Sequence, residues 1–377
     1  MTRKIKTTPG LLRVAFAAAL TVAITGTVSQ TRPVSFVKKV GGHDVVICPV
    51  DKVTETRDLP LSEIIESCEM VRLDASENAL IGQTWFPAIS ENHICIISHG
   101  NIAVKLFDRK TGKFLCEVGI KGRGPNEYNM LYGAQFSNDG KTIYLFTRSA
   151  PAKIFAYDLN GKFLKSIPLA INSYTFKAWF ENESAITVVT LPGPNNEVLC
   201  FQQTTGGDLL KKVPAEKHFR NGEEIFTNYT PGVVSFYVTG TDTLFHYDTA
   251  KNRLLPKFAL EFGEKKLLNT PRELPGYYYT GIRGADAKWR TIMVNKKTLY
   301  THYASLVNDF YGNIESQLFF INGYYVEPVP AITLKGRIDK ALQNSKLSSE
   351  MRKKLTDLNN SITEDDNDIV FYGKLKM

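Results

Sequence analysis

Cysteine is scarce in this sequence and is not arranged for cross-linking or metal binding. The 377 residues contain five cysteines, and no two of them form a CxxC pair. This excludes a small disulfide-rich scaffold and a zinc ribbon. Cys95 and Cys116 fall on strands that a third strand separates in the arrangement described below, a distance of about 9.6 Å that a disulfide cannot span. Cys48 and Cys68 are therefore the one pair that we consider for a bridge.

Sequence signatures of catalysis and cofactor binding are also missing. There is no G-x-S-x-G and no HExxH, and none of the six histidines forms a metal pair at helical spacing. Gly140-Lys141-Thr142 imitates the end of a phosphate loop, but six residues separate it from Gly133 where four are required. The acidic run 364–368 lacks the glycine and terminal Glu of a calcium loop. We therefore expect no cofactor, no metal site and no catalytic residue marked by a local motif.

Positive charge is concentrated at the N-terminus, and little excess remains elsewhere. Arg3, Lys4, Lys6 and Arg13 precede an uncharged stretch rich in Ala, Val and Thr, which is typical of a secretory signal peptide over residues 1–30. A retained membrane anchor is the alternative. Without this segment the net charge falls from +8 to +4, which argues against a nucleic-acid partner. We expect a periplasmic or secreted protein that contacts a membrane only through an uncleaved signal.

The sequence does contain a repeated β-hairpin. Val104–Asp108 leads through a turn into Phe114-Leu115, and fifty residues later Ile154–Asp158 leads through a similar turn into Phe163-Leu164. The run Leu244–Asp248 opens the same pattern again. Repetition of strand-like units at about 40 to 50 residues is the signature of the blades of a β-propeller.

The turn in each hairpin combines Asp with Gly. Asp108 and Asp158 can hydrogen-bond the backbone two residues on, and Gly112 and Gly161 tolerate the positive φ that such a turn needs. We therefore interpret these acidic residues as turn formers and not as catalytic carboxylates.

The predicted fold class is all-β, a six-bladed β-propeller formed by residues 31–377 as one domain. Apolar residues at helical spacing and a capping Ser348 predict a helical insertion at 335–368 in the last blade. A strand near Met70 should pair with that blade and close the ring, because an open ring exposes two sheet edges. The expected blades are Ile81–Gly119, Gly133–Leu169, Phe176–Val213, Val233–Phe262, Tyr277–Ala304, and a sixth from Leu306 to the final strand Ile369–Leu375.

The hairpin and the segment after it resemble the NHL repeat. The resemblance rests on Phe107-Asp108 and on Gly119–Tyr128, which reads GIKGRGPNEY. The chain after the signal is also similar to a family of bacterial exported six-bladed β-propellers of unknown function, related to TolB-like propellers, with a lead-in like Leu61–Glu66 and a closing strand like Val370–Lys376. The resemblance implies the fold and a location in the cell envelope, without an activity.

The loop Gly122–Tyr128 is the first candidate binding site. It joins the outermost strand of one blade to the innermost strand of the next, which places it near the central channel. Arg123 offers a planar fork for a carboxylate or phosphate, Glu127 can accept hydrogen bonds, and Tyr128 adds an amphipathic surface. The alternative is that the loop only shapes the crossing and that these side chains bond neighbouring backbone.

A second candidate lies at the entry to the fifth blade. Tyr277 and Tyr279 stand on a strand that we expect to be innermost, and Arg283 and Trp289 follow it. Aromatic side chains near a channel suit sugars or peptides, but alternating tyrosines also pack between adjacent blades.

Two functions fit these observations. The first is a non-catalytic binding module of the cell envelope that presents one face of the ring to a peptide, glycan or protein partner. The second is an NHL-like enzyme, a hydrolase, lactonase or lyase, whose channel-lining residues come from different blades and leave no local motif. The lack of a recognisable nucleophile or metal cluster favours the first.

Overall fold

The computed structural model describes residues 33–99, 103–149, 151–180, 182, 184–193, 197–220 and 222–377. Pro33–Met377 form one compact unit. The predicted signal peptide, residues 1–30, lies outside the described residues.

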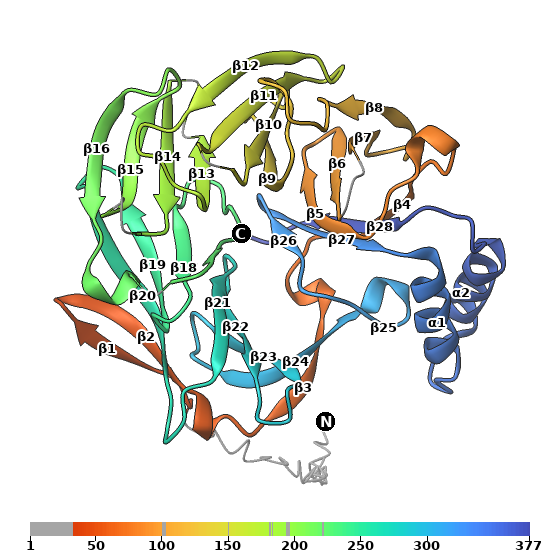
Figure 1. Ribbon diagram of the computed structural model, residues 1–377. Coiled ribbons are helices and arrows are strands. Elements are labelled where there is room, and N and C mark those ends of the chain that lie inside the picture. Colours follow the sequence, from red (N-terminus) through yellow and green to blue (C-terminus); the bar gives the residue numbers. More distant parts are fainter. Residues whose placement is uncertain are drawn as a thin grey trace, which may run out of the picture. The chain divides into compact units, whose positions relative to one another are not determined.

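Six sheets stand in a ring around a central axis, and each is one blade of a propeller (Figure 1). The first three blades are four-stranded antiparallel sheets whose strands follow chain order from the innermost to the outermost. Blade 1 holds β5 (Thr84–Ile89), β6 (His93–Ser98), β7 (Val104–Asp108) and β8 (Phe114–Val118). Blade 2 holds β9 (Leu131–Phe136), β10 (Thr142–Thr147), β11 (Lys153–Asp158) and β12 (Phe163–Pro168). Blade 3 holds β13 (Phe176–Phe180), β14 (Ala185–Thr190), β15 (Val198–Thr204) and β16 (Leu209–Pro214).

The next two blades are widened by strands from the N-terminal part of the unit. Blade 4 holds β17 (Ile225–Phe226), β18 (Ser235–Val238), β19 (Thr243–Asp248) and β20 (Arg253–Glu261), with β2 (His43–Pro49) parallel to β20 and β1 (Phe36–Val40) at the edge. Blade 5 holds β21 (Leu268–Glu273), β22 (Tyr277–Arg283), β23 (Trp289–Asn295) and β24 (Thr301–Asn308), with β3 (Thr56–Pro60) and β25 (Ile314–Glu315) on β24.

Blade 6 closes the ring by joining three strands from the C-terminal part of the chain to one from the N-terminal part. Its strands are β26 (Phe320–Ile321), β27 (Tyr324–Val329), β28 (Ile369–Lys374) and, outermost, β4 (Glu69–Arg72). Met70 pairs with Phe371 across the β4–β28 ladder, which confirms the predicted closure by a strand near Met70.

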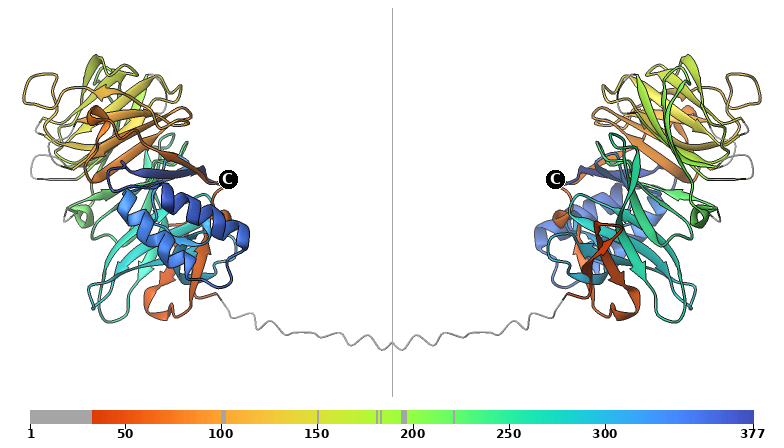
Figure 2. Two further views of the ribbon diagram at one scale, coloured as in Figure 1. Left: turned by 90° about the vertical axis from the view of Figure 1, so that its right-hand side faces the viewer. Right: turned by 90° about the vertical axis from the view of Figure 1, so that its left-hand side faces the viewer.

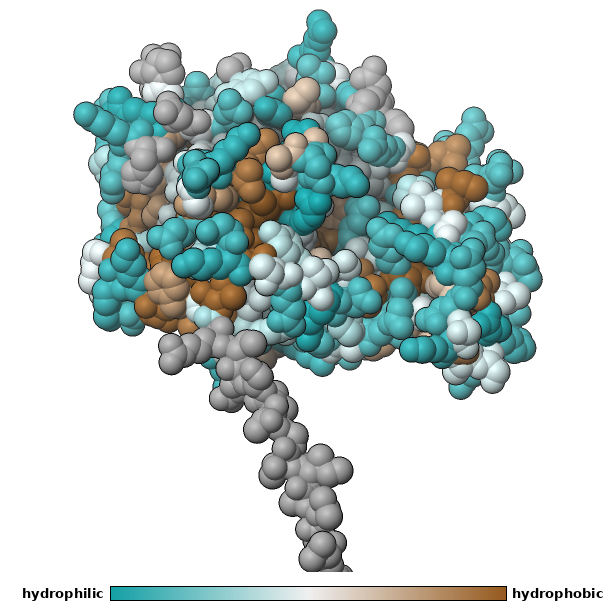
Figure 3. Space-filling view, turned by 90° about the horizontal axis from the view of Figure 1, so that it is seen from below, coloured by the Kyte–Doolittle hydropathy of each residue, from teal (hydrophilic) through white to brown (hydrophobic). Residues whose placement is uncertain are grey.

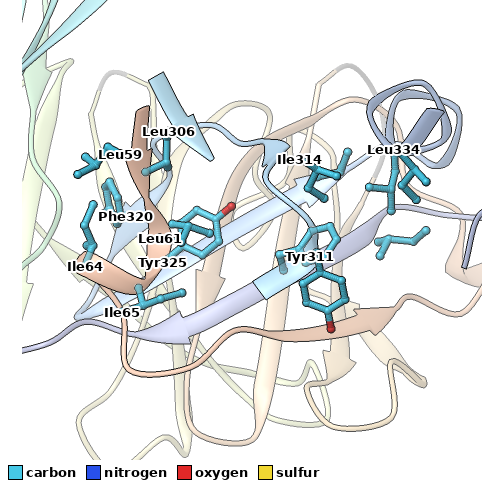
Figure 4. Packing of buried hydrophobic residues seen from close by; sticks show 14 of the residues in the cluster. Leu59, Leu61, Ile64, Ile65, Leu306, Tyr311, Ile314, Phe320, Tyr325 and Leu334 are labelled. Carbon is cyan, nitrogen blue, oxygen red and sulfur yellow. The ribbon is translucent and has the colours of Figure 1, made fainter. Parts of the chain in front are cut away.

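One apolar core joins these two parts. The N-terminal part contributes Leu59, Leu61, Ile64 and Ile65, which belong to the same buried cluster as Phe320 and Tyr325 (Figure 4). Phe371 of β28 is a further buried member of this cluster. Burial of this much apolar surface ties residues about 300 positions apart into one cooperative unit.

The strands differ in burial with their distance from the axis. The innermost strands β9 and β13 are buried along their whole length, whereas the outermost strand β12 is mostly exposed. Strands covered on both faces read as continuous apolar runs, and half-covered strands alternate. This difference in burial explains why the sequence repeat is easiest to recognise in the outer hairpins.

The Asp and Gly of each hairpin have the predicted turn geometry. Asp108 Oδ1 accepts the N–H groups of Lys110 and Thr111 at 3.1 and 2.7 Å, and Asp158 Oδ1 accepts two in the same way at 2.9 Å. Gly112 and Gly161 have φ of 73° and 76°.

The same glycines also form contacts between blades. A Cβ at Gly161 would lie 2.1 Å from the carbonyl oxygen of Glu117 at the end of β8, and one at Gly112 would lie 1.8 Å from that of Arg72 in β4. In blade 4 Asn252 replaces glycine, with φ of 50°, and donates from Nδ2 to the carbonyl of Lys212 at 3.1 Å. Each of these turns therefore rests on the outermost strand of the preceding blade.

Blades 4 and 5 begin earlier than predicted. Blade 4 starts at β17 and blade 5 at β21, so β22 with its tyrosines is the second strand and not the innermost one. The innermost strand β21 reads LNTPRE, with a proline and little apolar character. An innermost strand has a free edge, where proline costs no ladder hydrogen bond, so the usual strand pattern is weak there.

Two helices lie between β27 and β28, in the predicted insertion. They are α1 (Ala331–Leu342) and α2 (Ser349–Ser361), and they pack side by side at the rim (Figures 1 and 2). Ser348 caps α2 as predicted, accepting the N–H of Met351 at 3.1 Å. The helix α1 begins four residues before position 335, directly after Pro330, whose fixed φ suits the start of a helix.

Seen from below, hydrophilic side chains are interspersed with hydrophobic patches (Figure 3). Exposed apolar residues include Phe36, Val37 and Val40 of β1.

All five cysteines are free thiols, Cys48 and Cys68 among them. Among the described residues no helix is both long and apolar enough to cross a membrane.

Candidate functional site

A cavity of about 310 Å³ lies in the central channel. Residues of the innermost strand of every blade line it, together with neighbouring turns. Ligand pockets typically measure about 300 to 1,000 Å³ and combine apolar walls with a few polar groups. Here aromatic residues such as Trp85, Phe86, Tyr132 and Phe226 dominate, and the charged residues are Lys177, Glu224 and Arg272.

Lys177 is the most unusual residue of this cavity. It stands in β13 between Phe176 and Ala178, and only 7% of it is exposed. Its Nζ lies 3.7 Å from the centre of the Tyr132 ring and 5.5 Å from that of Phe86. Within the described residues, its one hydrogen bond is a long contact of 3.4 Å to the carbonyl of Tyr132. An ammonium group has three donors, so most of its hydrogen-bonding capacity is unused.

Two guanidinium groups add positive charge beside this lysine. Arg272 of β21 lies over the ring of Phe226 at 4.9 Å, and Arg148 lies over Tyr132 at 5.4 Å. Burial, and then the charges of Arg272 and Arg148, lower the pKa of Lys177 from 10.5 to about 7. Desolvation and like charges both disfavour the protonated amine, and they outweigh the attraction of the aromatic faces.

A single carboxylate faces these cations among the residues lining the cavity. Glu224 precedes β17, and burial raises its pKa while Arg272 opposes the rise. One of its oxygens accepts the N–H of Ile225 at 2.9 Å. One negative group therefore stands against three basic ones.

Several donors around the cavity have no partner among the described residues. They are the Nε atoms of Arg148 and Arg272, the hydroxyl of Tyr132 and, behind the wall, Nε1 of Trp179. Burying such groups unpaired costs free energy, about 1 to 3 kcal/mol each by mutational data. The channel is therefore rich in positive charge and in unused donors.

The loop Gly122–Tyr128 is braced mainly by its own hydrogen bonds. Glu127 accepts the N–H of Gly124 at 2.8 Å, and Tyr128 exchanges backbone hydrogen bonds with Ile120 and Gly122. Tyr128 is only 3% exposed, and its hydroxyl accepts from the N–H of Val104 and donates to the carbonyl of Val118. Of the three predicted binding residues here, Arg123 is the one whose side chain is exposed.

The loop nevertheless lies beside the channel cavity. Trp85 lines this cavity and also a neighbouring groove that Lys121, Tyr128 and Met130 help to form. Its ring stacks on that of His99 with centroids 4.3 Å apart. Tyr128 of the loop thus shares a groove with Trp85, and none of the residues Gly122–Tyr128 lines the channel cavity itself.

The second candidate is divided between two places. Arg283 pairs with Trp289 across β22 and β23, six residues along β22 from Tyr277, or about 20 Å. Trp289 lines a groove between blade 5 and α1, whereas Tyr279 is buried and donates to Asn228 Oδ1 at 3.0 Å. Tyr277 lies at the opposite end of β22, 3.5 Å from Glu63. These four residues do not form one site.

Sequence reasoning missed the charged residues of the channel. A weak signal was present, because Lys177 interrupts the apolar run Phe176–Phe180 that otherwise reads as a fully buried strand. No signal linked it to Arg272 or Glu224, which come from other blades. Within the part of the chain that the structure describes, no three His, Cys, Asp or Glu side chains gather as metal ligands do.

Comparison with solved structures shows the same fold in a protein of low sequence identity. A protein from Bacteroides fragilis NCTC 9343 described as exported superposes with a TM-score of 0.62 at 16% identity, over 86% of this chain and 98% of that one. A member of the DUF4221 family from Bacteroides vulgatus gives a TM-score of 0.45 at 11% identity, over 83% and 97%. BamB from Moraxella catarrhalis gives 0.34 at 15% identity, over 62% of each chain. The fold comparison rests on the first of these.

Sequence comparison gives one family. The family model described as "Domain of unknown function (DUF4934)" matches residues 45–374, almost the whole described unit. No curated protein matches the chain.

Proposed function

Since the chain belongs to the DUF4934 family, whose description names no activity, we propose from its geometry that it is an exported binding module of the bacterial envelope. It takes a small ligand, or the end of a peptide or glycan, into the central channel. The predicted signal over residues 1–30 and the exported protein that shares the fold support the location in the periplasm or outside the cell.

One observation carries this proposal. The channel cavity brings together residues from all six innermost strands, and several of its buried donors have no partner within the described part of the chain. Unpaired buried polar groups lower stability, so natural folds keep few of them without a use. A ligand in the channel would pair these donors and cover the aromatic walls.

Tryptophan fluorescence tests the proposal with matched variants. The sequence has three tryptophans: Trp85 lines the cavity, Trp179 lies behind its wall, and Trp289 lines the separate groove at the rim. Dipeptides, uronic acids and oligosaccharides are titrated into the full chain. We expect a saturable change in wild type and in Trp289→Phe that is lost in Trp85→Phe.

Two results would contradict a channel ligand. One is a saturable change that survives in Trp85→Phe and disappears in Trp289→Phe, which would move the site to the rim. The other is the absence of any saturable change across the panel.

A further inference from the structure

We propose that the channel cavity binds the anionic group of its ligand, and that Lys177 takes up a proton when this group enters. This rests on the proposed function and names the chemistry of the same site. The anion is a carboxylate or a phosphate ester carried on a flat apolar body.

The charges around the cavity favour an anion. Lys177, Arg272 and Arg148 are basic, whereas Glu224 is the one acidic residue in the lining. Arg148 and Arg272 each keep an unpaired Nε, and Tyr132 keeps an unpaired hydroxyl, within the described residues. Hydrogen bonds from charged donors to an anion are about twice as strong as neutral ones, because the charge assists them. A neutral ligand would leave the basic groups uncompensated.

The walls favour an aromatic or other flat apolar body. Phe86, Tyr132 and Phe226 present ring faces to the three basic groups. Trp85 and Phe320 extend the aromatic lining. A volume of about 310 Å³ limits the occupant to a small molecule or to one terminal group of a longer partner.

The proton uptake follows from the surroundings of Lys177. The titratable and charged groups that face it in the described chain are Tyr132 from blade 2, Arg148 after β10, Glu224 and Tyr229 from blade 4, and Arg272 from blade 5. With a pKa of about 7, the amine is largely neutral at pH 8 in the free protein. An anion beside it favours the charged form and raises this pKa, so a proton passes from solvent to Nζ as the anion binds.

Calorimetry with matched aryl probes tests this inference on the full chain. Benzoate, phenyl phosphate and benzamide share one ring and differ in charge, and the first two distinguish a carboxylate from a phosphate. We expect at least one of the two anions to bind about tenfold tighter than benzamide. Titration at pH 8 in buffers of different ionisation enthalpy should show nearly one proton taken up per anion bound. At pH 6 benzoate, which is fully ionised at both pH values, should show nearly none.

Three variants distinguish the effect of the charge at position 177 from an effect on folding. Lys177→Met should lose about tenfold in affinity for the anion and should lose the proton uptake. Lys177→Arg should keep the affinity but take up no proton, because the guanidinium is already charged. Lys165→Met removes the same charge from the exposed outer strand β12 and should behave as wild type.

The outcomes distinguish this inference from the proposed function. Equal binding of benzamide and the anions, no binding of either anion at 10 mM probe (an order-of-magnitude ceiling for weak ligands), or unchanged proton uptake in Lys177→Met would overturn it. The proposed function stands in each case if any ligand of the panel still gives the Trp85-dependent signal. Loss of that signal for every compound would overturn both.

Discussion

The hairpin turns between blades and the wall of the central channel are built in opposite ways. Each turn is a short continuous segment. Asp and Gly form it in blades 1 and 2, where the Asp bonds the turn's own backbone and the Gly lies against the preceding blade. The channel wall instead takes one short stretch from each blade, and its charged residues Lys177, Glu224 and Arg272 occur once each. Repetition therefore serves stability here, and charged residues that depart from it gather around the channel cavity.

Opening the ring should have the largest effect, because the hairpin turns and the channel wall both depend on ring closure. Deleting Phe371–Met377 removes most of β28, which joins β27 to β4 and buries Phe371 in the joint core. We expect loss of the cooperative thermal transition, or a melting temperature lower by more than about 10 °C, in circular dichroism. Deleting only the fully exposed Met377 is the control and should change little. An unchanged transition in the longer deletion would contradict closure by the terminal strands.

Gly→Ala substitutions at two turn glycines distinguish the cost of a clash between blades from the cost of a strained backbone. Gly161 and Gly140 both have positive φ, of 76° and 70°, but only a Cβ at Gly161 meets a neighbour, the Glu117 carbonyl at 2.1 Å. Gly140→Ala should cost about 1 to 2 kcal/mol for the left-handed backbone alone. Gly161→Ala should cost about 3 kcal/mol or more, measured by denaturant unfolding. Equal costs would mean that the turn does not bear on the neighbouring blade.

Removing the buried amine should stabilise the protein. Lys177→Met puts an unbranched apolar side chain, one atom shorter, in place of a buried amine whose one side-chain hydrogen bond among the described residues is long, so the melting temperature should rise by about 2 °C or more. The pKa of Lys177 is about 7 in the folded chain and 10.5 when unfolded, so the unfolded chain binds more protons between these values. Wild-type stability therefore rises with pH across this window.

The gain from Lys177→Met should accordingly be largest at pH 7 and below and should shrink toward pH 10. Thermal unfolding of both proteins at pH 6.5 and 9.5 measures this difference. A gain that is independent of pH would show that the amine is solvated or paired in the native state.

The loop beside the channel should give the smallest effects. Glu127→Ala removes an acceptor for the Gly124 amide and should cost about 1 kcal/mol of stability. Arg123→Ala changes an exposed side chain and should stay within about 0.5 kcal/mol. Denaturant unfolding of both variants measures these two costs. A larger cost for Arg123→Ala than for Glu127→Ala would show that the Arg123 side chain stabilises the fold.

The predicted turns were correct because their cause is local. Asp108 and Gly112 satisfy hydrogen bonds and a backbone conformation within five residues of each other, so the pattern is visible without the fold. Blade 5 was misplaced because its innermost strand β21 is short of apolar residues, while the second strand β22 has the stronger strand pattern.

The candidate site was predicted less well than the fold. Tyr128 has the amphipathic character of a binding residue, but its hydroxyl is used inside the protein by Val104 and Val118. Lys177 looked like one lysine among many, because its burial depends on Tyr132 and Arg272 from neighbouring blades. Partners so far apart in sequence leave no periodic signal.

Sequence alone determined the number and kind of the blades, since the units of a repeated β-hairpin pack against one another. Only the tertiary structure decided which side chains meet at the axis. The reason is physical: hydrogen bonds of a turn form between near neighbours in the chain, whereas desolvation and charge around an amine depend on everything packed against it.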